Sequence, residues 1–123
     1  MSFVTRDVAM EVVSGLRSTL ERLDRRNRAL ADQAMRAASS ILLNIEEGNQ
    51  RKGGDRQYLF RVAKGSVEEL RGALLIGVAW GYIEEPHEVM ALLDRLGRLL
   101  YGLANPQRSA SCRSRSASTG STD

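Results

Sequence analysis

The chain has 123 residues, a formal charge of +3, 42% hydrophobic residues and 27% charged residues, which is typical of one folded globular domain and excludes wholesale disorder. Aromatic residues make up only 5%, so the core is expected to be aliphatic, which favours helices over strands. The single cysteine, Cys112, excludes an intrachain disulfide and fits a reducing compartment. No leader-like N-terminal run is evident, and no apolar run approaches the ~20 residues that cross a bilayer, so we expect a cytoplasmic protein with no membrane partner.

Apolar residues recur at helical spacing in four segments, and short polar turns join these segments. The expected helices cover residues 5–23, 28–49, 56–82 and 86–104. Four amphipathic helices with short connections predict an all-α fold, an antiparallel up-down-up-down four-helix bundle over residues 1–106. The Ser- and Arg-rich residues 107–123 have too little apolar surface to fold and are predicted to be a disordered tail.

Residues that favour helix ends mark the boundaries of these segments. Thr5, Asn27 and Asp55 are expected N-caps of the first three helices, because their side-chain oxygens can accept a hydrogen bond from the first turn. Pro86 is expected to open the fourth helix, where its missing N–H is not needed. Gly81 is expected near the end of the third helix.

The third expected helix is apolar around more of its circumference than a small bundle needs, since a stripe of about 100° is enough. The apolar side chains outside its main stripe include Phe60, Val67, Leu75 and Val78. We expect a second copy of the chain to cover this surplus surface, so these four residues form the predicted oligomer interface.

Positive charge gathers in the first half of the chain, with 12 Lys and Arg against 8 Asp and Glu up to Ser66, whereas residues 67–107 have 3 against 6. Two inter-helix turns carry the candidate nucleic-acid-binding residues, Arg25, Arg26 and Arg28 in one and Arg51, Lys52 and Arg56 in the other. In an up-down bundle these turns lie at opposite ends, so each would be a separate phosphate-binding site or simply a solvated turn.

Polar and glycine residues cluster around the second turn, namely Asn44, Glu47, Gly48, Gly65, Ser66 and Glu69. Two interpretations are open for this cluster: a recognition surface, or a polar seam where two helices or two subunits exchange hydrogen bonds. The seam is the favoured interpretation, because buried polar groups need partners. Gly48 lies on the apolar face of its helix and is expected to permit close packing.

The order of these residues resembles the small four-helix-bundle proteins encoded by intervening sequences within bacterial 23S ribosomal RNA genes. The resemblance spans residues 28–84 and rests on Ser40-Ile41, Asn44-Ile45, Glu47-Gly48, Arg51, Ala63, Gly65-Ser66, Glu69-Leu70 and Gly81-Tyr82. Leu42 stands where the family commonly has proline, and Glu46 where it has a small residue. The resemblance implies a homopentamer, as a ring or barrel, and kinship with accessory proteins of diversity-generating retroelements, which assist a reverse transcriptase and its RNA.

Catalytic and metal-binding patterns are weak throughout the sequence. His87 is the only histidine, Cys112 has no local histidine partner, and the adjacent Glu46 and Glu47 diverge by about 100° on a helix. Trp80 and Tyr82 are interpreted as packing or interface groups, and so few aromatics favour recognition of RNA backbone and shape over base stacking.

We therefore expect a non-enzymatic, homo-oligomeric scaffold without a cofactor, a metal or a small-molecule substrate. Its predicted partner is RNA or an RNA-processing protein such as a retroelement reverse transcriptase. The alternative is a purely structural oligomer that interacts with proteins and binds no nucleic acid.

Overall fold

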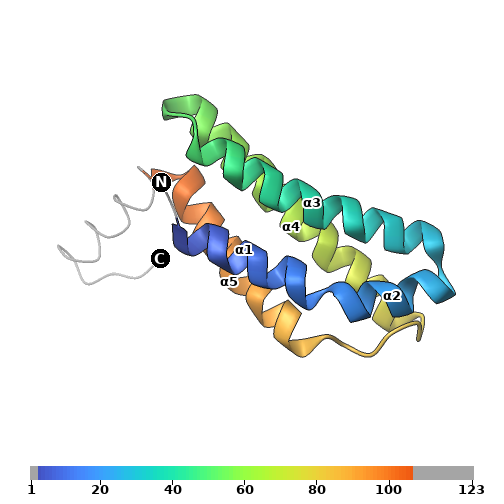
Figure 1. The fold of residues 1–123 in the computed structure, drawn as a ribbon. Coiled ribbons are helices and arrows are strands. Elements are labelled where there is room, and N and C mark those ends of the chain that lie inside the picture. Colours follow the sequence, from blue (N-terminus) through green and yellow to red (C-terminus); the bar gives the residue numbers. More distant parts are fainter. Residues whose placement is uncertain (1–2, 107–123) are drawn as a thin grey trace.

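The computed structural model describes residues 3–106, so the predictions for the tail at 107–123, Cys112 included, lie outside the described residues. The described residues form five α-helices and no strand, which confirms the all-α prediction. The helices are α1 (Phe3–Gly15), α2 (Arg17–Arg26), α3 (Arg28–Asn49), α4 (Gly53–Ala79) and α5 (His87–Ala104). Figure 1 shows them lying along a common long direction, with the start of α1 and the end of α5 at the same end of the molecule. None of these helices is long and apolar enough to span a membrane.

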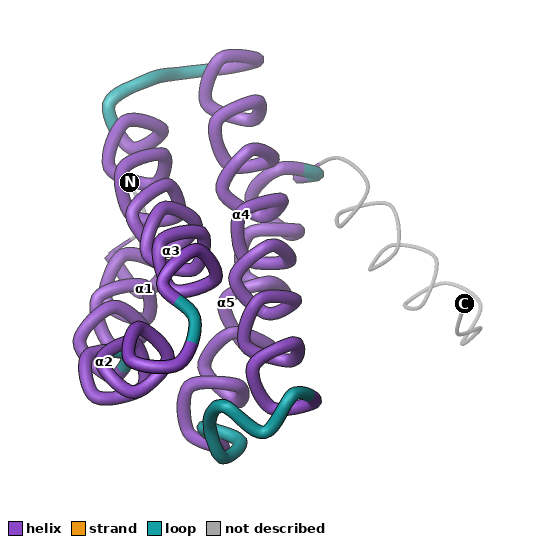
Figure 2. The backbone as a smooth tube through the Cα atoms, turned by 90° about the vertical axis from the view of Figure 1, so that its right-hand side faces the viewer, coloured by secondary structure: helices purple, strands orange, loops and turns teal. Residues whose placement is uncertain are grey.

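Short connections separate the helices, as Figure 2 shows. Helix α3 packs on α4, α4 also packs on α5, and α5 packs on α1. Helices α1 and α2 both lie against α3. Each helix therefore turns an apolar face toward a shared core.

The first expected helix, residues 5–23, is divided into two, which corrects that prediction. The interruption is at Leu16, whose N–H donates to the carbonyl of Val13 at 3.3 Å, while its own carbonyl accepts from Leu20 at 2.8 Å. Gly15 stands just before the break and has low helix propensity. A Cβ there would lie 3.3 Å from Val89 of α5, so the glycine also permits close approach of that helix.

Two of the expected helix starts are confirmed. The side-chain oxygen of Asn27 accepts a hydrogen bond from the N–H of Leu30 at 3.0 Å and caps α3. Pro86 is the N-cap residue of α5, and its carbonyl accepts from the N–H of Met90 at 2.9 Å. Asn27 caps its helix as expected, and Pro86 lies one residue before the first helical residue, His87, instead of being that residue.

Two other expected caps are wrong. Thr5 lies inside α1 and is buried, because the helix begins two residues earlier. Asp55 lies inside the first turn of α4, which begins at Gly53 after the N-cap residue Lys52. Gly53 has a φ of 62°, a left-handed backbone that glycine adopts without strain, so the glycine pair starts the helix instead of preceding it.

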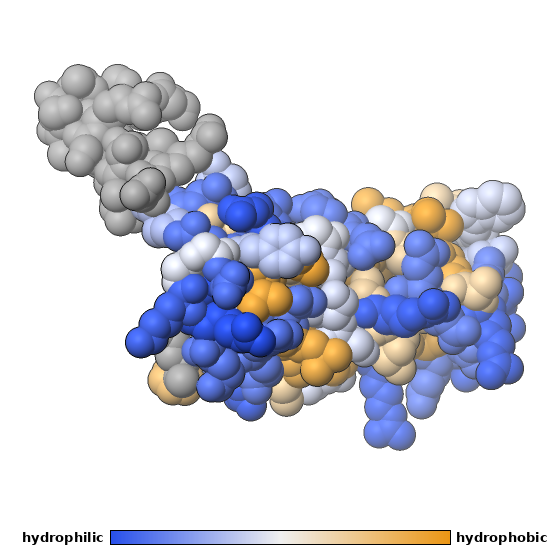
Figure 3. Space-filling view, turned by 90° about the horizontal axis from the view of Figure 1, so that it is seen from above, coloured by the Kyte–Doolittle hydropathy of each residue, from blue (hydrophilic) through white to orange (hydrophobic). Residues whose placement is uncertain are grey.

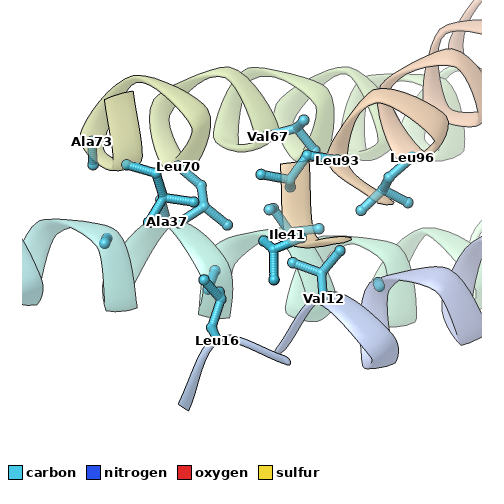
Figure 4. Close-up of a cluster of buried hydrophobic side chains, with 14 of the residues drawn as sticks. Val12, Leu16, Ala37, Ile41, Val67, Leu70, Ala73, Leu93 and Leu96 are labelled. Carbon is cyan, nitrogen blue, oxygen red and sulfur yellow. The ribbon is translucent and has the colours of Figure 1, made fainter. Parts of the chain in front are cut away.

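The core is aliphatic except for one phenylalanine. Its largest fully buried side chains are Phe60, Leu16, Leu23, Ile41, Ile45, Leu70, Leu74, Leu93, Leu96, Leu100, Val8 and Val12. Figure 4 shows side chains from α1, α3, α4 and α5 meeting in this cluster. Burial of these groups is the main source of the stability of the fold.

The predicted oligomer interface is corrected at two of its four residues. Phe60 is 0% exposed and Val67 2% exposed, because α3 and α5 cover two sides of α4 within one chain. Figure 4 shows Val67 beside Leu93 of α5. Val78 is half-buried and packs against the core, whereas Leu75 remains 46% exposed. Of the four residues, Leu75 presents the most surface to a second copy.

The end of α3 is packed tightly against the start of α4. A Cβ at Gly48 would lie only 2.7 Å from Cε1 of the Phe60 ring, closer than real side chains approach. The ring is fully buried, and because protein interiors are close-packed it can move aside only by displacing its neighbours. The expectation that Gly48 permits close packing is confirmed.

Substitution of this glycine should therefore destabilise the fold. We expect Gly48→Ala to lower the free energy of unfolding by about 1–3 kcal/mol, because the added methyl overpacks the core. Urea unfolding followed by circular dichroism measures this change. Gly65, also in a helix but with no atom within 4 Å of an added Cβ, is the matched control. Gly65→Ala should stabilise by about 0.5–1 kcal/mol, and equal stability of the two variants would contradict the packing argument.

Candidate nucleic-acid interface

The two predicted basic clusters lie at opposite ends of α3. This helix has 22 residues, which corresponds to about 33 Å at a rise of 1.5 Å per residue. The turn between α2 and α3 carries Arg25, Arg26 and Arg28, and the turn between α3 and α4 carries Arg51 and Lys52 (Figure 1). As expected, they form no joint patch on one chain.

The cluster at the α3–α4 turn is partly engaged in holding the turn together. Arg51 forms an ion pair with Glu47 one turn earlier, with 3.1 Å between Nη2 and Oε2. Arg56 donates from Nη1 to the carbonyl of Gly48 at 3.4 Å, and its guanidinium lies 4.7 Å from the centroid of the Phe60 ring. Within the described part of the chain, Lys52 forms no ion pair, hydrogen bond or ring contact of this kind. Because Arg51 and Arg56 both stabilise the turn, their presence there has a structural explanation.

The cluster at the α2–α3 turn is different. Arg25, Arg26 and Arg28 are exposed, and among residues 3–106 no carboxylate lies within ion-pair distance of them. The guanidinium of Arg26 lies 5.5 Å from the centroid of the Tyr82 ring, which accounts for its orientation without neutralising its charge. These arginines are available to bind phosphate.

A groove of about 580 Å³ opens next to this turn, lined by Arg22, Gly81, Tyr82, Ile83 and Glu84. The chain reverses after α4 at Gly81, which has a φ of 74° and ends the helix as the sequence predicted. After the reversal the N–H groups of Tyr82 and Ile83 donate to the carbonyl of Gly77 at 2.8 and 3.4 Å. The loop is thereby fixed against the end of α4, with Tyr82 beside α2.

Sequence reasoning missed two members of this site, Arg22 and Tyr82. Arg22 precedes Arg26 by four residues, so the two share one side of α2, and this spacing was visible in the sequence. The sequence predicts that Tyr82 is a packing or interface group, and the partly buried ring does pack against the core. Its proximity to α2 depends on the reversal at Gly81 and has no local sequence signal.

The motif residues around the α3–α4 turn form a polar seam within one chain. The hydroxyls of Ser40 and Ser66 lie 2.8 Å apart, across α3 and α4. Asn44 donates from Nδ2 to the carbonyl of Ser40 at 2.8 Å and to its hydroxyl at 3.1 Å, and Ser66 also bonds the carbonyl of Val62 at 3.2 Å. For Ser66 the favoured interpretation as a seam between helices is confirmed. Asn44 supports the seam only indirectly, because both of its hydrogen bonds stay within α3.

The remaining motif residues have separate positions. Glu47 is paired with Arg51, and Gly48 lies under Phe60. Gly65 and Glu69 are exposed on α4, and Glu69 borders a groove of about 470 Å³ between α3 and α4. Gly65 and Glu69 take no part in the polar seam.

The described residues contain no group of three or more His, Cys, Asp or Glu side chains arranged to hold a metal ion. His87 lies at the exposed start of α5, with its Nδ1 3.2 Å from a carboxylate oxygen of Glu85. This pair is too small to form a metal site.

A family model described as 23S rRNA-intervening sequence protein matches residues 4–102. This chain belongs to that family. The match confirms the resemblance found in the sequence and extends it to nearly the whole of the described part. No curated protein matches the chain.

The fold of this intervening-sequence protein is also found in a solved structure. A protein of unknown function from the S23 ribosomal protein family of Bacteroides thetaiotaomicron VPI-5482 superposes with a TM-score of 0.74 at 20% sequence identity. The similar region covers 82% of this chain and 98% of the other. At this identity the likeness shows a shared fold.

Removing the seam should cost stability. We expect Ser66→Ala to lower the free energy of unfolding by about 1 kcal/mol, because a buried hydroxyl contact between α3 and α4 is lost. Ser40→Ala should cost a similar amount, and the double variant should cost less than the sum, since both changes remove the same contact. Urea unfolding of the three variants measures the coupling. Strict additivity would show that the two hydroxyls do not interact.

Proposed function

We propose that this intervening-sequence protein is a non-enzymatic, homo-oligomeric scaffold that binds RNA through its phosphate backbone. The observation that carries the proposal is the set of exposed guanidinium groups at the α2–α3 turn, with no acidic partner within residues 3–106. Planar guanidinium forks match phosphate oxygens and remain charged at all physiological pH values. The family description, which refers to 23S rRNA, makes RNA the natural ligand class to test.

We further propose that the five helices are an antiparallel four-helix bundle in which α1 and α2 together form the first helix. The packing of both α1 and α2 on α3, and of α5 on both α1 and α4, supports this arrangement. The interruption at Leu16 is a single residue, and Leu16 is itself buried in the core, so α2 continues along the side of α3 on which α1 lies.

Self-association is proposed to use the outer side of α4. Leu75 is 46% exposed and its neighbour Ile76 is 49% exposed, which is unusual for two consecutive aliphatic side chains in a helix. Gly72, one turn earlier, has no atom within 4 Å of an added Cβ and leaves room for an approaching chain. Figure 3 looks onto the face over α3 and α4 and shows apolar patches among the charged side chains.

We propose a homopentamer, the assembly that the family resemblance implies. Repetition around a ring would multiply contacts that are weak in one subunit. Such an assembly would act in the cytoplasm beside RNA or an RNA-processing protein. A reverse transcriptase is the proposed protein partner, through a relation to retroelement accessory proteins. The exposed Leu75 and Ile76 also favour the second candidate, an oligomer that binds only proteins.

The RNA proposal predicts a change in salt dependence. The triple variant Arg25→Ala, Arg26→Ala, Arg28→Ala should bind RNA more weakly, and its slope of log affinity against log salt should fall by about 2, since each lost phosphate contact contributes roughly 0.7. Fluorescence anisotropy of a labelled RNA at several salt concentrations measures both values. Arg51→Ala with Lys52→Ala at the opposite turn is the control, with a smaller expected change. RNA affinity that is independent of the α2–α3 arginines would refute the proposal and favour the protein-binding candidate.

The assembly proposal predicts a change in mass. The parent chain should scatter light as an oligomer, and Leu75→Glu with Ile76→Glu should reduce the mass to one chain, because buried carboxylates without partners oppose association. Leu43→Glu, at an exposed leucine of α3, is the matched control and should leave the mass unchanged. A parent mass equal to one chain would exclude the homo-oligomer.

A further inference from the structure

We propose that the surface beside the α2–α3 turn binds an unpaired base of a single-stranded nucleic acid, with Trp80 and Tyr82 as the stacking platform and Arg22 and Arg26 as the phosphate clamp. This inference rests on the proposed RNA binding and specifies the chemistry of the ligand at the same end of the molecule. It revises the expectation, drawn from aromatic content alone, that the protein has no base-stacking surface.

The two rings are already stacked, with Trp80 exposed and Tyr82 partly buried. Trp80 is 71% exposed, more than any other large hydrophobic side chain in residues 3–106. Its ring centroid lies 6.4 Å from that of Tyr82, and the two ring planes are inclined by 29°. An exposed indole face beside a second ring can extend the stack by one base, and stacking of this kind strengthens binding by roughly 5- to 150-fold per base.

The backbone holds this pair in place before any ligand binds. The N–H of Trp80 donates to the carbonyl of Ile76 at 3.0 Å, and that of Tyr82 donates to the carbonyl of Gly77 at 2.8 Å. The left-handed Gly81 between them sets the reversal that brings the second ring back toward α2. The backbone of the site is therefore ordered before binding, so no loop-ordering entropy has to be lost, which favours affinity.

Two arginines of α2 lie close to Tyr82 and supply the positive charge for the proposed phosphate contacts. The guanidinium of Arg26 is 5.5 Å from the centroid of the Tyr82 ring, and Arg22 lines the adjacent groove together with Tyr82. Alternation of aromatic faces and cations is the pattern by which proteins bind single strands. Glu84 is the acidic member of the groove and repels phosphate, so the strand is expected to cross on the side of α2.

Subunit contact is the competing explanation for the exposed indole. Ile76 precedes Trp80 by one helical turn, so the aliphatic surface adjoins the indole. The ring partner of Trp80 nevertheless lies on the other side, toward α2, and is a tyrosine next to an arginine, which favours a nucleotide over an apolar helix. The adjacent groove of about 580 Å³ is lined by one ring, that of Tyr82, together with Arg22 and Glu84, and this polar lining suits a nucleotide better than an apolar helix.

Trp80 is the only tryptophan in the chain, so its fluorescence reports directly on this site. The full chain is titrated with a 12-nucleotide oligoadenylate RNA, with an abasic oligomer of the same length and charge, and with the duplex that the RNA forms with oligouridylate. Anisotropy of a label on each nucleic acid reports binding. We expect saturable quenching of the tryptophan with the single strand and none with the abasic oligomer or the duplex.

Variants separate stacking from charge. Trp80→Ala should weaken binding of the single strand by roughly 5- to 150-fold and leave that of the abasic oligomer unchanged. Trp80→Phe should retain most of the affinity, because it keeps a ring at the position. The DNA oligomer of the same sequence should bind with similar affinity, because the proposed contacts are to base and phosphate and none is to the ribose hydroxyl.

Each contrary outcome has a distinct meaning. Binding of the single strand without quenching, or equal affinity of Trp80→Ala, overturns the stacking site and leaves the phosphate-binding proposal intact. No binding of any oligomer at low salt overturns both. A lower mass of Trp80→Ala in light scattering, with circular dichroism unchanged, assigns the indole to a subunit contact and overturns the inference.

Discussion

The enclosure of α4 between α3 and α5 is the constraint on which the rest of the structure depends. It removes Phe60 and Val67 from water, so two of the apolar side chains outside the main stripe of α4 are buried within one chain. Gly48 makes the closest of these contacts possible, because only a residue without a side chain lets the Phe60 ring lie against α3. On and next to α4, the large apolar side chains that remain exposed are Tyr58 near its start, Leu75 and Ile76 near its end, and Trp80 just beyond it. The proposed interactions use the group at the end of the helix.

The sequence predicted the elements that depend on local chemistry. Helical periodicity located α3, α4 and α5 to within a few residues, and the caps at Asn27 and Pro86 were recognised because capping involves atoms only a few residues apart. The same reasoning failed at Thr5 and Asp55, where a competent capping residue lies inside a helix. Propensity identifies residues that can cap, but the helix start depends on what the neighbouring turn packs against.

Features that depend on contacts between residues far apart in the sequence were harder to predict. Periodicity showed that α4 was apolar on several sides but could not show that its own neighbours would bury two of them, which is why Phe60 and Val67 were misplaced. Aromatic content indicated too few rings for stacking, although two of the rings and a guanidinium are gathered at one turn. Composition is an average over the chain, whereas a site needs only a few residues brought together by one backbone reversal.

The shared position of the start of α1 and the end of α5 has a practical consequence. An affinity handle or a surface linkage attached through either of these helix ends would enter at the pole remote from the junction of α2 and α3. Immobilising the protein in this way would leave the α2–α3 turn, with Arg25, Arg26 and Arg28, facing the solution and accessible to large ligands.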